Sequence, residues 1–167
     1  MGTAFAKARK GFERLMEFVV IALMVALAVV VVLGVTYRKF GAALVWYDEI
    51  ASVLLAWVTY YGAALAALRR GHIGASGLVD ALPPAARVPV VLFAEACVFG
   101  FFILLGYVGW SVLGVLATDT LVSLPEISVA WTQSVIPIGS LLFVIAQAMS
   151  LPETLRAARR ERPERGR

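Results

Sequence analysis

Charged residues are scarce in this sequence: Asp, Glu, Lys and Arg make up 16% of its 167 residues, against about a quarter in an average soluble domain. It contains one cysteine and one histidine. An internal disulfide is therefore excluded, and a zinc site of cysteines and histidines lacks its ligands. A haem held by two axial histidines is excluded for the same reason. We also find no phosphate-binding loop and no nucleophile–base pair, so the sequence indicates no enzyme, no catalytic residue and no cofactor.

Hydrophobic residues, in contrast, make up 61% of the chain, and the mean hydropathy is +0.87. A soluble globule of this size would expose much of that apolar surface to water, so the composition argues against a soluble enzyme and against a nucleic-acid-binding module. Four uncharged runs, each of 19 to 25 residues, occupy 18–37, 50–68, 96–118 and 127–151. About 20 apolar residues cross a hydrocarbon core of about 30 Å as a helix. We therefore predict an all-α integral membrane protein with a single four-helix domain, its spans at about 16–37, 50–68, 94–117 and 127–150.

The distribution of basic residues predicts the orientation. Of the 15 Lys and Arg residues, 13 lie before the first run, between the second and third runs, or after the fourth. Only Arg38 and Lys39 lie on the other side. Because basic residues favour the cytoplasmic side, this bias predicts that both termini are cytoplasmic, with residues 152–167 as a basic tail.

Two connections are expected to lie at the membrane surface. Residues 40–47 are too few to cross and end in Trp46 and Tyr47, whose rings favour the headgroup level. The second connection contains several glycines and prolines and predicts a short amphipathic helix at about 76–82. Short interfacial helices therefore complete the predicted fold.

Polar residues inside the spans are the first candidates for function, because burying them in lipid costs free energy. Glu95 falls near the inner end of the third span, where it is either an interfacial carboxylate or, less simply, a functional one. Glu126, Gln133, Ser140 and Gln147 recur every seven residues along the fourth run. This spacing predicts one polar face, kinked at Pro137, which either lines a solute pathway or bonds to a neighbouring helix; we favour the bonding role.

The sequence around the second span resembles a known family. The residues that carry the resemblance are Trp46-Tyr47-Asp48-Glu49, Trp57, Leu68-Arg69-Arg70-Gly71-His72-Ile73 and Leu82-Pro83-Pro84. In these motifs and in its four spans the chain resembles the small membrane subunit of tripartite ATP-independent periplasmic (TRAP) transporters, the DctQ-like family. The resemblance implies a subunit of a secondary transporter in a bacterial or archaeal inner membrane. Its partners would be a large multi-span permease subunit, a periplasmic solute-binding protein and membrane lipids, with no nucleic acid.

The resemblance also implies a division of labour. The large subunit would carry the substrate and ion sites, and the small one would extend its scaffold. Uptake would be driven by an ion gradient, usually of sodium. The transported solutes would be organic anions such as C4-dicarboxylates or sialic acids. We hypothesise that Trp46, Asp48 and Glu49 anchor the second span at the outer interface or pair with the large subunit. Arg69, Arg70 and His72 would do the same at the inner interface, partly through anionic lipid. The candidate subunit- and lipid-interface residues are Trp46, Asp48, Glu49, Trp57, Arg69, Arg70, His72, Glu95, Gln133 and Gln147.

Two other functions remain open at the level of sequence. A stand-alone small transporter, active as a homo-oligomer, would need an essential carboxylate in the membrane, and Glu95 is the candidate. A membrane-anchor subunit of another complex would need no such residue. The small four-span subunit of tripartite tricarboxylate transporters is a related alternative, but the Trp-Asp-Glu and Gly-His-Ile elements favour the TRAP family.

Overall fold

The computed structural model describes residues 3–69 and 83–159, and within them every regular element is a helix. The elements are α1 (Thr3–Lys39), α2 (Tyr47–Leu68), α4 (Pro84–Leu116), α5 (Val129–Gln133) and α6 (Val135–Arg159). Four stretches are long and apolar enough to cross a membrane, lying in α1, α2, α4 and the α5–α6 segment. The all-α fold with four membrane helices is thus confirmed.

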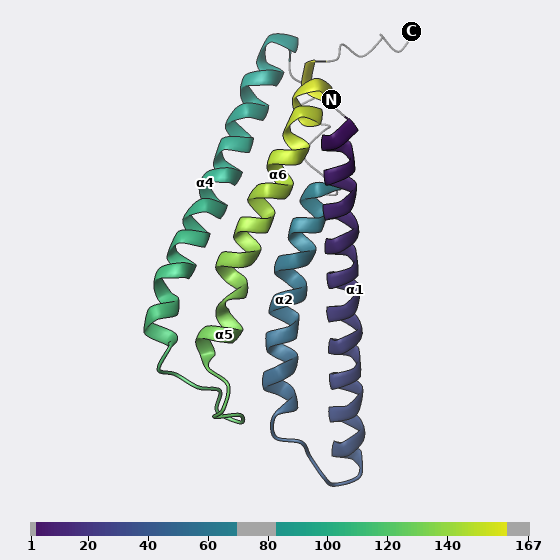
Figure 1. Cartoon of the computed structure of the whole chain (residues 1–167), viewed down its shortest axis with the longest axis vertical. Coiled ribbons are helices and arrows are strands. Elements are labelled where there is room, and N and C mark those ends of the chain that lie inside the picture. Colours follow the sequence, from purple (N-terminus) through teal and green to yellow (C-terminus); the bar gives the residue numbers. More distant parts are fainter. Residues whose placement is uncertain (1–2, 70–82, 160–167) are drawn as a thin grey trace.

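The four long helices lie side by side in one layer (Figure 1), in the order α1, α2, α6, α4. The helix contacts follow this order, because α2 packs on α1 and α6, and α6 packs on α2 and α4. The N-terminal end of α1 and the C-terminal end of α6 lie at the same end of the layer (Figure 1); we call this the terminal end, and the other the loop end. The inner helices thus have neighbours on both sides, whereas α1 and α4 form the open edges.

Helix α1 packs with one side only. Met16 is buried, while Phe18, Ile21 and Val25 keep 71%, 54% and 58% of their surface exposed. The helix ends at Lys39, and Gly41 follows with a φ of 77°, which is favourable for glycine. The N–H groups of Gly41 and Ala42 bond back to the Arg38 and Tyr37 carbonyls. Residues 40–46 then form a non-helical turn, so no interfacial helix is found there.

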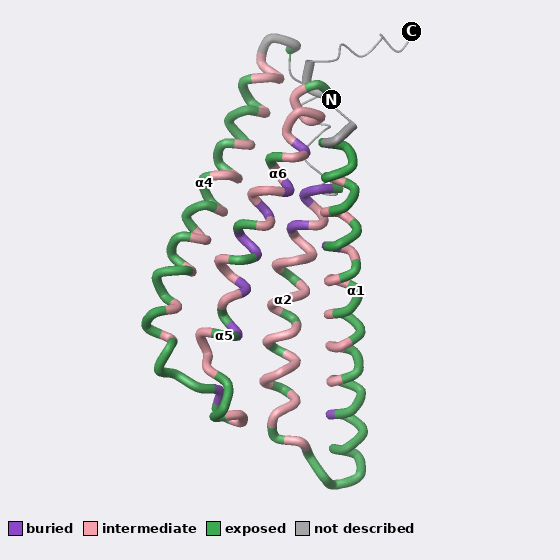
Figure 2. The backbone as a smooth tube through the Cα atoms, in the orientation of Figure 1, coloured by how far each residue is buried: buried purple, intermediate pink, exposed green. Residues whose placement is uncertain are grey.

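The core lies between α2 and α6 toward the terminal end (Figure 2). It consists of Ala64, Ala67, Leu68, Phe143 and Ala146. The three alanines let the two helix backbones approach closely, which is how helices associate in lipid. Phe143 adds a ring stack on Phe102 of α4, with centroids 3.6 Å apart and planes 10° from parallel.

The fourth membrane segment is not one continuous helix. It is divided at Ser134 into α5 and α6. The cause is Pro137, which has no N–H to donate to the Gln133 carbonyl four residues earlier. The predicted four-residue polar face is therefore wrong: Glu126 lies in the preceding loop and Gln133 on α5, so only Ser140 and Gln147 share α6.

Helix lengths also differ from the minimum that a membrane requires. α1 has 37 residues and α4 has 33, which corresponds to roughly 50–55 Å of helix against a core of about 30 Å. α6 continues to Arg159, so the first part of the predicted basic tail is helical. The amphipathic helix expected at 76–82 lies outside the described residues.

Candidate functional site

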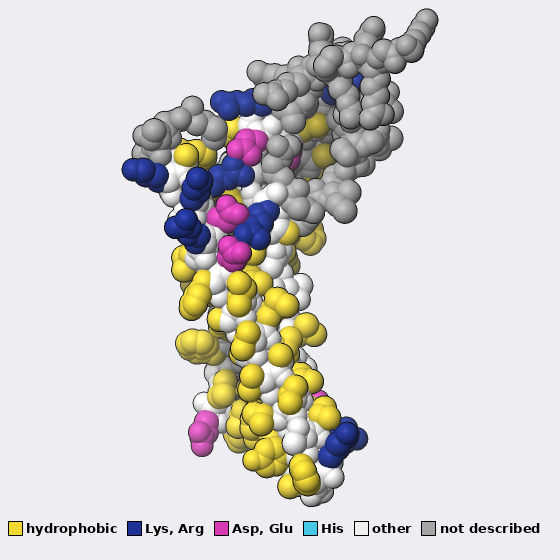
Figure 3. All heavy atoms as spheres, turned by 90° about the vertical axis from the view of Figure 1, so that its right-hand side faces the viewer, with side chains coloured by type: hydrophobic (Ala, Val, Ile, Leu, Met, Phe, Trp, Pro, Cys, Tyr) yellow, Lys and Arg dark blue, Asp and Glu magenta, His cyan; other side chains and the backbone are white. Residues whose placement is uncertain are grey.

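The charged side chains lie mainly at the ends of the molecule. Figure 3 shows the face that includes α1. On it, Lys, Arg, Asp and Glu side chains gather toward the terminal end, a hydrophobic band follows, and a few charges lie at the loop end. This banding is what a membrane-embedded surface requires, because charges are stable only outside the hydrocarbon core. The candidate residues accordingly fall into a loop-end group, a terminal-end group and a group between α4 and α6.

At the loop end, Glu49 holds the connection between α4 and α5. Its carboxylate accepts the backbone N–H groups of Val122 and Ser123, each at 2.9 Å, and also the Ser123 hydroxyl. Asp48 beside it is exposed, and both carboxylates lie in the first turn of α2, where the helix dipole favours negative charge. Trp46 is the N-cap residue, half-buried, and its side chain makes no capping bond. The two acidic residues of the motif thus differ: Glu49 has partners within the chain, and Asp48 faces outward.

Trp57 joins α2 to α5. Its indole N–H donates to the Thr132 carbonyl at 2.9 Å, and its ring stacks on Trp131 with centroids 6.4 Å apart and planes 9° from parallel. Thr132 is at the C-terminal turn of α5, next to the break before α6, where carbonyl groups lose helical partners. Trp57 therefore gives a partner to the Thr132 carbonyl, one residue before the Gln133 carbonyl that Pro137 leaves without a helical donor. Gln133, the next residue, is exposed.

At the terminal end, Arg69 pairs with two carboxylates of α1. Its Nε lies 2.9 Å from Glu13 Oε1 and one terminal nitrogen lies 3.0 Å from Glu17 Oε2. The hydrogen bonds to Glu13 and then to Glu17 hold the pKa of the Arg69 guanidinium above its usual range, so it stays charged. This arginine, expected at a lipid or partner interface, thus has partners within the chain. Arg70 and His72, the other residues predicted for this interface, lie outside the described residues.

Arg9 completes the terminal-end network and was not among the predicted residues. It donates to the Leu68 carbonyl at 3.0 Å, at the C-terminus of α2, and its other terminal nitrogen pairs with Glu153 of α6. A cation at a helix C-terminus is favourable because the last carbonyls carry partial negative charge. The sequence held one signal for it: Arg9, Glu13 and Glu17 recur every four residues and therefore share a helix face.

Between α4 and α6, Glu95 and Gln147 form a hydrogen bond. The Gln147 amide nitrogen donates to Glu95 Oε2 at 2.6 Å, and both side chains are half-buried. Polar bonds of this kind hold neighbouring helices together in lipid. Of the predicted polar face, Gln147 alone makes such a bond to another helix within the described ranges.

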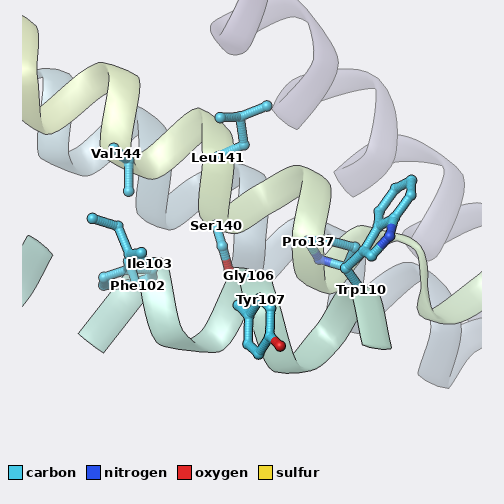
Figure 4. Close-up of a pocket in the computed structure, with 9 residues that line it drawn as sticks. All are labelled: Phe102, Ile103, Gly106, Tyr107, Trp110, Pro137, Ser140, Leu141 and Val144. Carbon is cyan, nitrogen blue, oxygen red and sulfur yellow. The ribbon is translucent and has the colours of Figure 1, made fainter. Parts of the chain in front are cut away.

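A groove with a volume of about 360 Å³ lies between the same two helices, nearer the loop end (Figure 4). Its lining is mostly apolar. The buried Ser140 hydroxyl points from α6 toward α4 at Gly106 and has no hydrogen-bond partner among the described residues. Tyr107 and Trp110 of α4 border the groove, with 73% and 72% of their surfaces exposed. Across 3–69 and 83–159, no three His, Cys, Asp or Glu side chains gather as metal ligands.

Comparison with known proteins identifies the family of the chain. Over 143 residues the chain is 29% identical to the sialic acid TRAP transporter small permease protein SiaQ of Vibrio cholerae serotype O1, covering 83% of this chain and 80% of that protein. The sequence profile described as "Tripartite ATP-independent periplasmic transporters, DctQ component" matches residues 27–157, which include α2, α4, α5 and most of α6. The chain is therefore a member of the DctQ family, a small permease subunit of a TRAP transporter.

Proposed function

We propose that this subunit is the scaffold of a TRAP transporter, which holds a large permease subunit in the membrane while that partner moves the solute. The transported solute is an organic anion bearing a carboxylate, delivered by a periplasmic solute-binding protein. Uptake is driven by an ion gradient, with sodium as the coupling ion. The complex lies in a bacterial or archaeal inner membrane with both termini of this chain in the cytoplasm.

The single-layer arrangement of the helices carries this proposal. A row of four helices leaves both faces and both edges uncovered, whereas a closed bundle would cover one side of each helix. The exposed apolar side chains of α4 include Phe93, Tyr107 and Trp110, each more than 70% exposed. Such a surface contacts either lipid or a second membrane protein. A scaffold subunit needs a broad apolar surface of this type to contact its partner, and it needs only a small buried core of its own.

The polar groups that were candidates for a transport pathway support the same conclusion. Glu95 bonds to Gln147, a member of the predicted polar face, so both groups have a partner within the chain. Transporters that bind ions and anions at mid-membrane commonly pair interrupted helices from two repeated halves. Here the α5–α6 segment has one interruption, and the other described helices have no matching one. We therefore place the anion and ion sites in the large subunit.

The choice of solute rests on the comparison. The Vibrio cholerae relative is named for sialic acid, which is a carboxylate, and the family resemblance extends to C4-dicarboxylates. The 13 basic residues on one predicted side support cytoplasmic termini.

Uptake by whole cells tests the proposal. A strain that carries the large subunit and binding protein but lacks this chain is expected to lose sodium-dependent uptake of labelled sialic acid and dicarboxylates, and the chain supplied in trans is expected to restore it. Uptake that continues without the chain would contradict the scaffold role. Asp48→Ala, with Thr59→Ala as an exposed control on the same helix, is expected to lower recovery of the complex, because Asp48 is the outward-facing acid of the motif.

A further inference from the structure

We propose that the outward face of α1 binds an anionic phospholipid, with Lys7, Lys10 and Arg14 holding the headgroup. This binding site is separate from the proposed scaffold role, and its test does not depend on that role. The three residues recur at intervals of three and four positions, so they lie on one face of the helix. All three are exposed.

The two sides of the α1 N-terminal segment have different partners. Arg9, Glu13 and Glu17 face α2 and α6, where they pair with Arg69, Glu153 and the Leu68 carbonyl. The acidic groups of this region therefore already have basic partners. Lys7, Lys10 and Arg14 centre on the helix face opposite the buried Met16, beside the Arg9–Glu13–Glu17 face, and form no ion pair with any carboxylate in the described part of the chain. Three cations on one exposed stripe favour an anionic ligand.

The same face becomes apolar directly after Arg14. Phe18, Ile21 and Val25 continue the stripe at the same helical spacing, and each exposes more than half of its surface. Along the axis, the distance from Arg14 to Val25 is about 16 Å at 1.5 Å per residue, or about half of a 30 Å hydrocarbon core. The stripe thus has cations first and then apolar side chains over the depth of one leaflet. A phospholipid has the matching order, with a charged headgroup followed by acyl chains. An acidic protein surface would match the cations but leave the apolar half of the stripe without a partner.

The location along the helix supports the same ligand. The basic residues lie at the terminal end, above the hydrophobic band of Figure 3. Lys and Arg side chains at this level reach the headgroups while their aliphatic stems stay on apolar surface. Each basic residue near an anionic membrane contributes about fivefold in affinity.

Lipid titration of the purified full-length chain tests the proposal. The probes are phosphatidylglycerol and phosphatidylcholine with identical acyl chains, and the readout is the number and affinity of lipids retained in native mass spectrometry. The wild-type chain is expected to prefer phosphatidylglycerol. The K7Q/K10Q variant is expected to lose roughly fivefold of that preference per residue, and adding R14Q is expected to abolish it. Salt at about 1 M should weaken the wild-type preference by screening.

The matched control is R38Q/K39Q, which removes the same charge from the other end of α1. Arg38 and Lys39 are adjacent and so point in different directions, and they form no stripe. This variant is expected to keep the wild-type preference. Equal affinity of wild-type and K7Q/K10Q/R14Q chains for phosphatidylglycerol would overturn the proposal, as would an equal loss in R38Q/K39Q. Unchanged lipid binding with loss of a co-purifying protein would show that the stripe binds protein instead. Circular dichroism checks that each variant keeps its helices. If the multiple variants do not fold, the single variant R14Q replaces them in the lipid titration.

Discussion

Glu49 and Ser123 connect the start of α2 to the loop between α4 and α5, with the Ser123 backbone N–H 2.9 Å from a Glu49 carboxylate oxygen. The connection spans 74 positions in the sequence. Helix α4 packs on α6, and the contact through Glu49 also ties the loop-end connection of α4 to α2, in the other half of the layer. The acidic motif before the second span therefore has an internal structural role, in addition to any contact with a partner.

Glu49→Gln is expected to loosen the loop at Val122 and Ser123, because the amide keeps one acceptor oxygen where the carboxylate has two. Hydrogen exchange measured by mass spectrometry should show several-fold faster exchange of these two amides. Asp48→Asn is the matched control, since Asp48 is exposed and makes no such contact with the loop. Equal protection of the loop in both variants would show that the Glu49 contacts do not hold it.

Trp57→Phe is expected to lower the free energy of unfolding by about 1 kcal/mol, because it removes the donor to the Thr132 carbonyl and keeps most of the ring stack on Trp131. Trp57→Ala should cost more, since it removes the stack as well. Thermal unfolding in detergent measures both. Trp110→Phe, at a position that is 72% exposed, should have little effect; an effect as large as that of Trp57→Phe would argue against the hydrogen bond as the cause.

Gly139→Ala is expected to separate α2 from α6. An added Cβ would lie 2.7 Å from the Tyr60 Cβ, which is fixed to the α2 backbone and cannot move aside. Overpacking of this kind costs about 1–3 kcal/mol. Gly100→Ala is the control, because nothing lies within 4 Å of its added Cβ. A Gly139→Ala melting temperature at or above that of Gly100→Ala would contradict the close approach of the two helices.

Glu95→Gln is expected to leave transport by the assembled complex intact, because the amide oxygen can still accept from Gln147. Gln147→Leu should instead weaken the α4–α6 contact by roughly 0.6–1.7 kcal/mol, the range for hydrogen bonds between membrane helices. Solute uptake by reconstituted complexes and thermal unfolding measure the two effects. If uptake is abolished while the Glu95→Gln complex stays folded, Glu95 is a functional carboxylate. That result would support the alternative hypothesis of a stand-alone transporter.

The sequence was sufficient for the number of membrane helices and the family, because hydrophobicity and short motifs are local properties. It was insufficient for pairings between helices. The partners of Glu49 and Arg69 depend on the order of the helices in the layer, which hydropathy does not encode. The seven-residue spacing of Gln133 and Ser140 was misleading, because Pro137 interrupts the helix between the ends of that pattern. The Arg9–Glu13–Glu17 spacing was visible as a helix face, but its partners on α2 and α6 were not.

Purification of this chain from its native membrane in mild detergent, with identification of what accompanies it, tests the scaffold role most directly. The account predicts stoichiometric recovery of a large, multi-span permease subunit, with recovery reduced by Asp48→Ala. Recovery of the chain alone, as a homo-oligomer, would contradict the scaffold role.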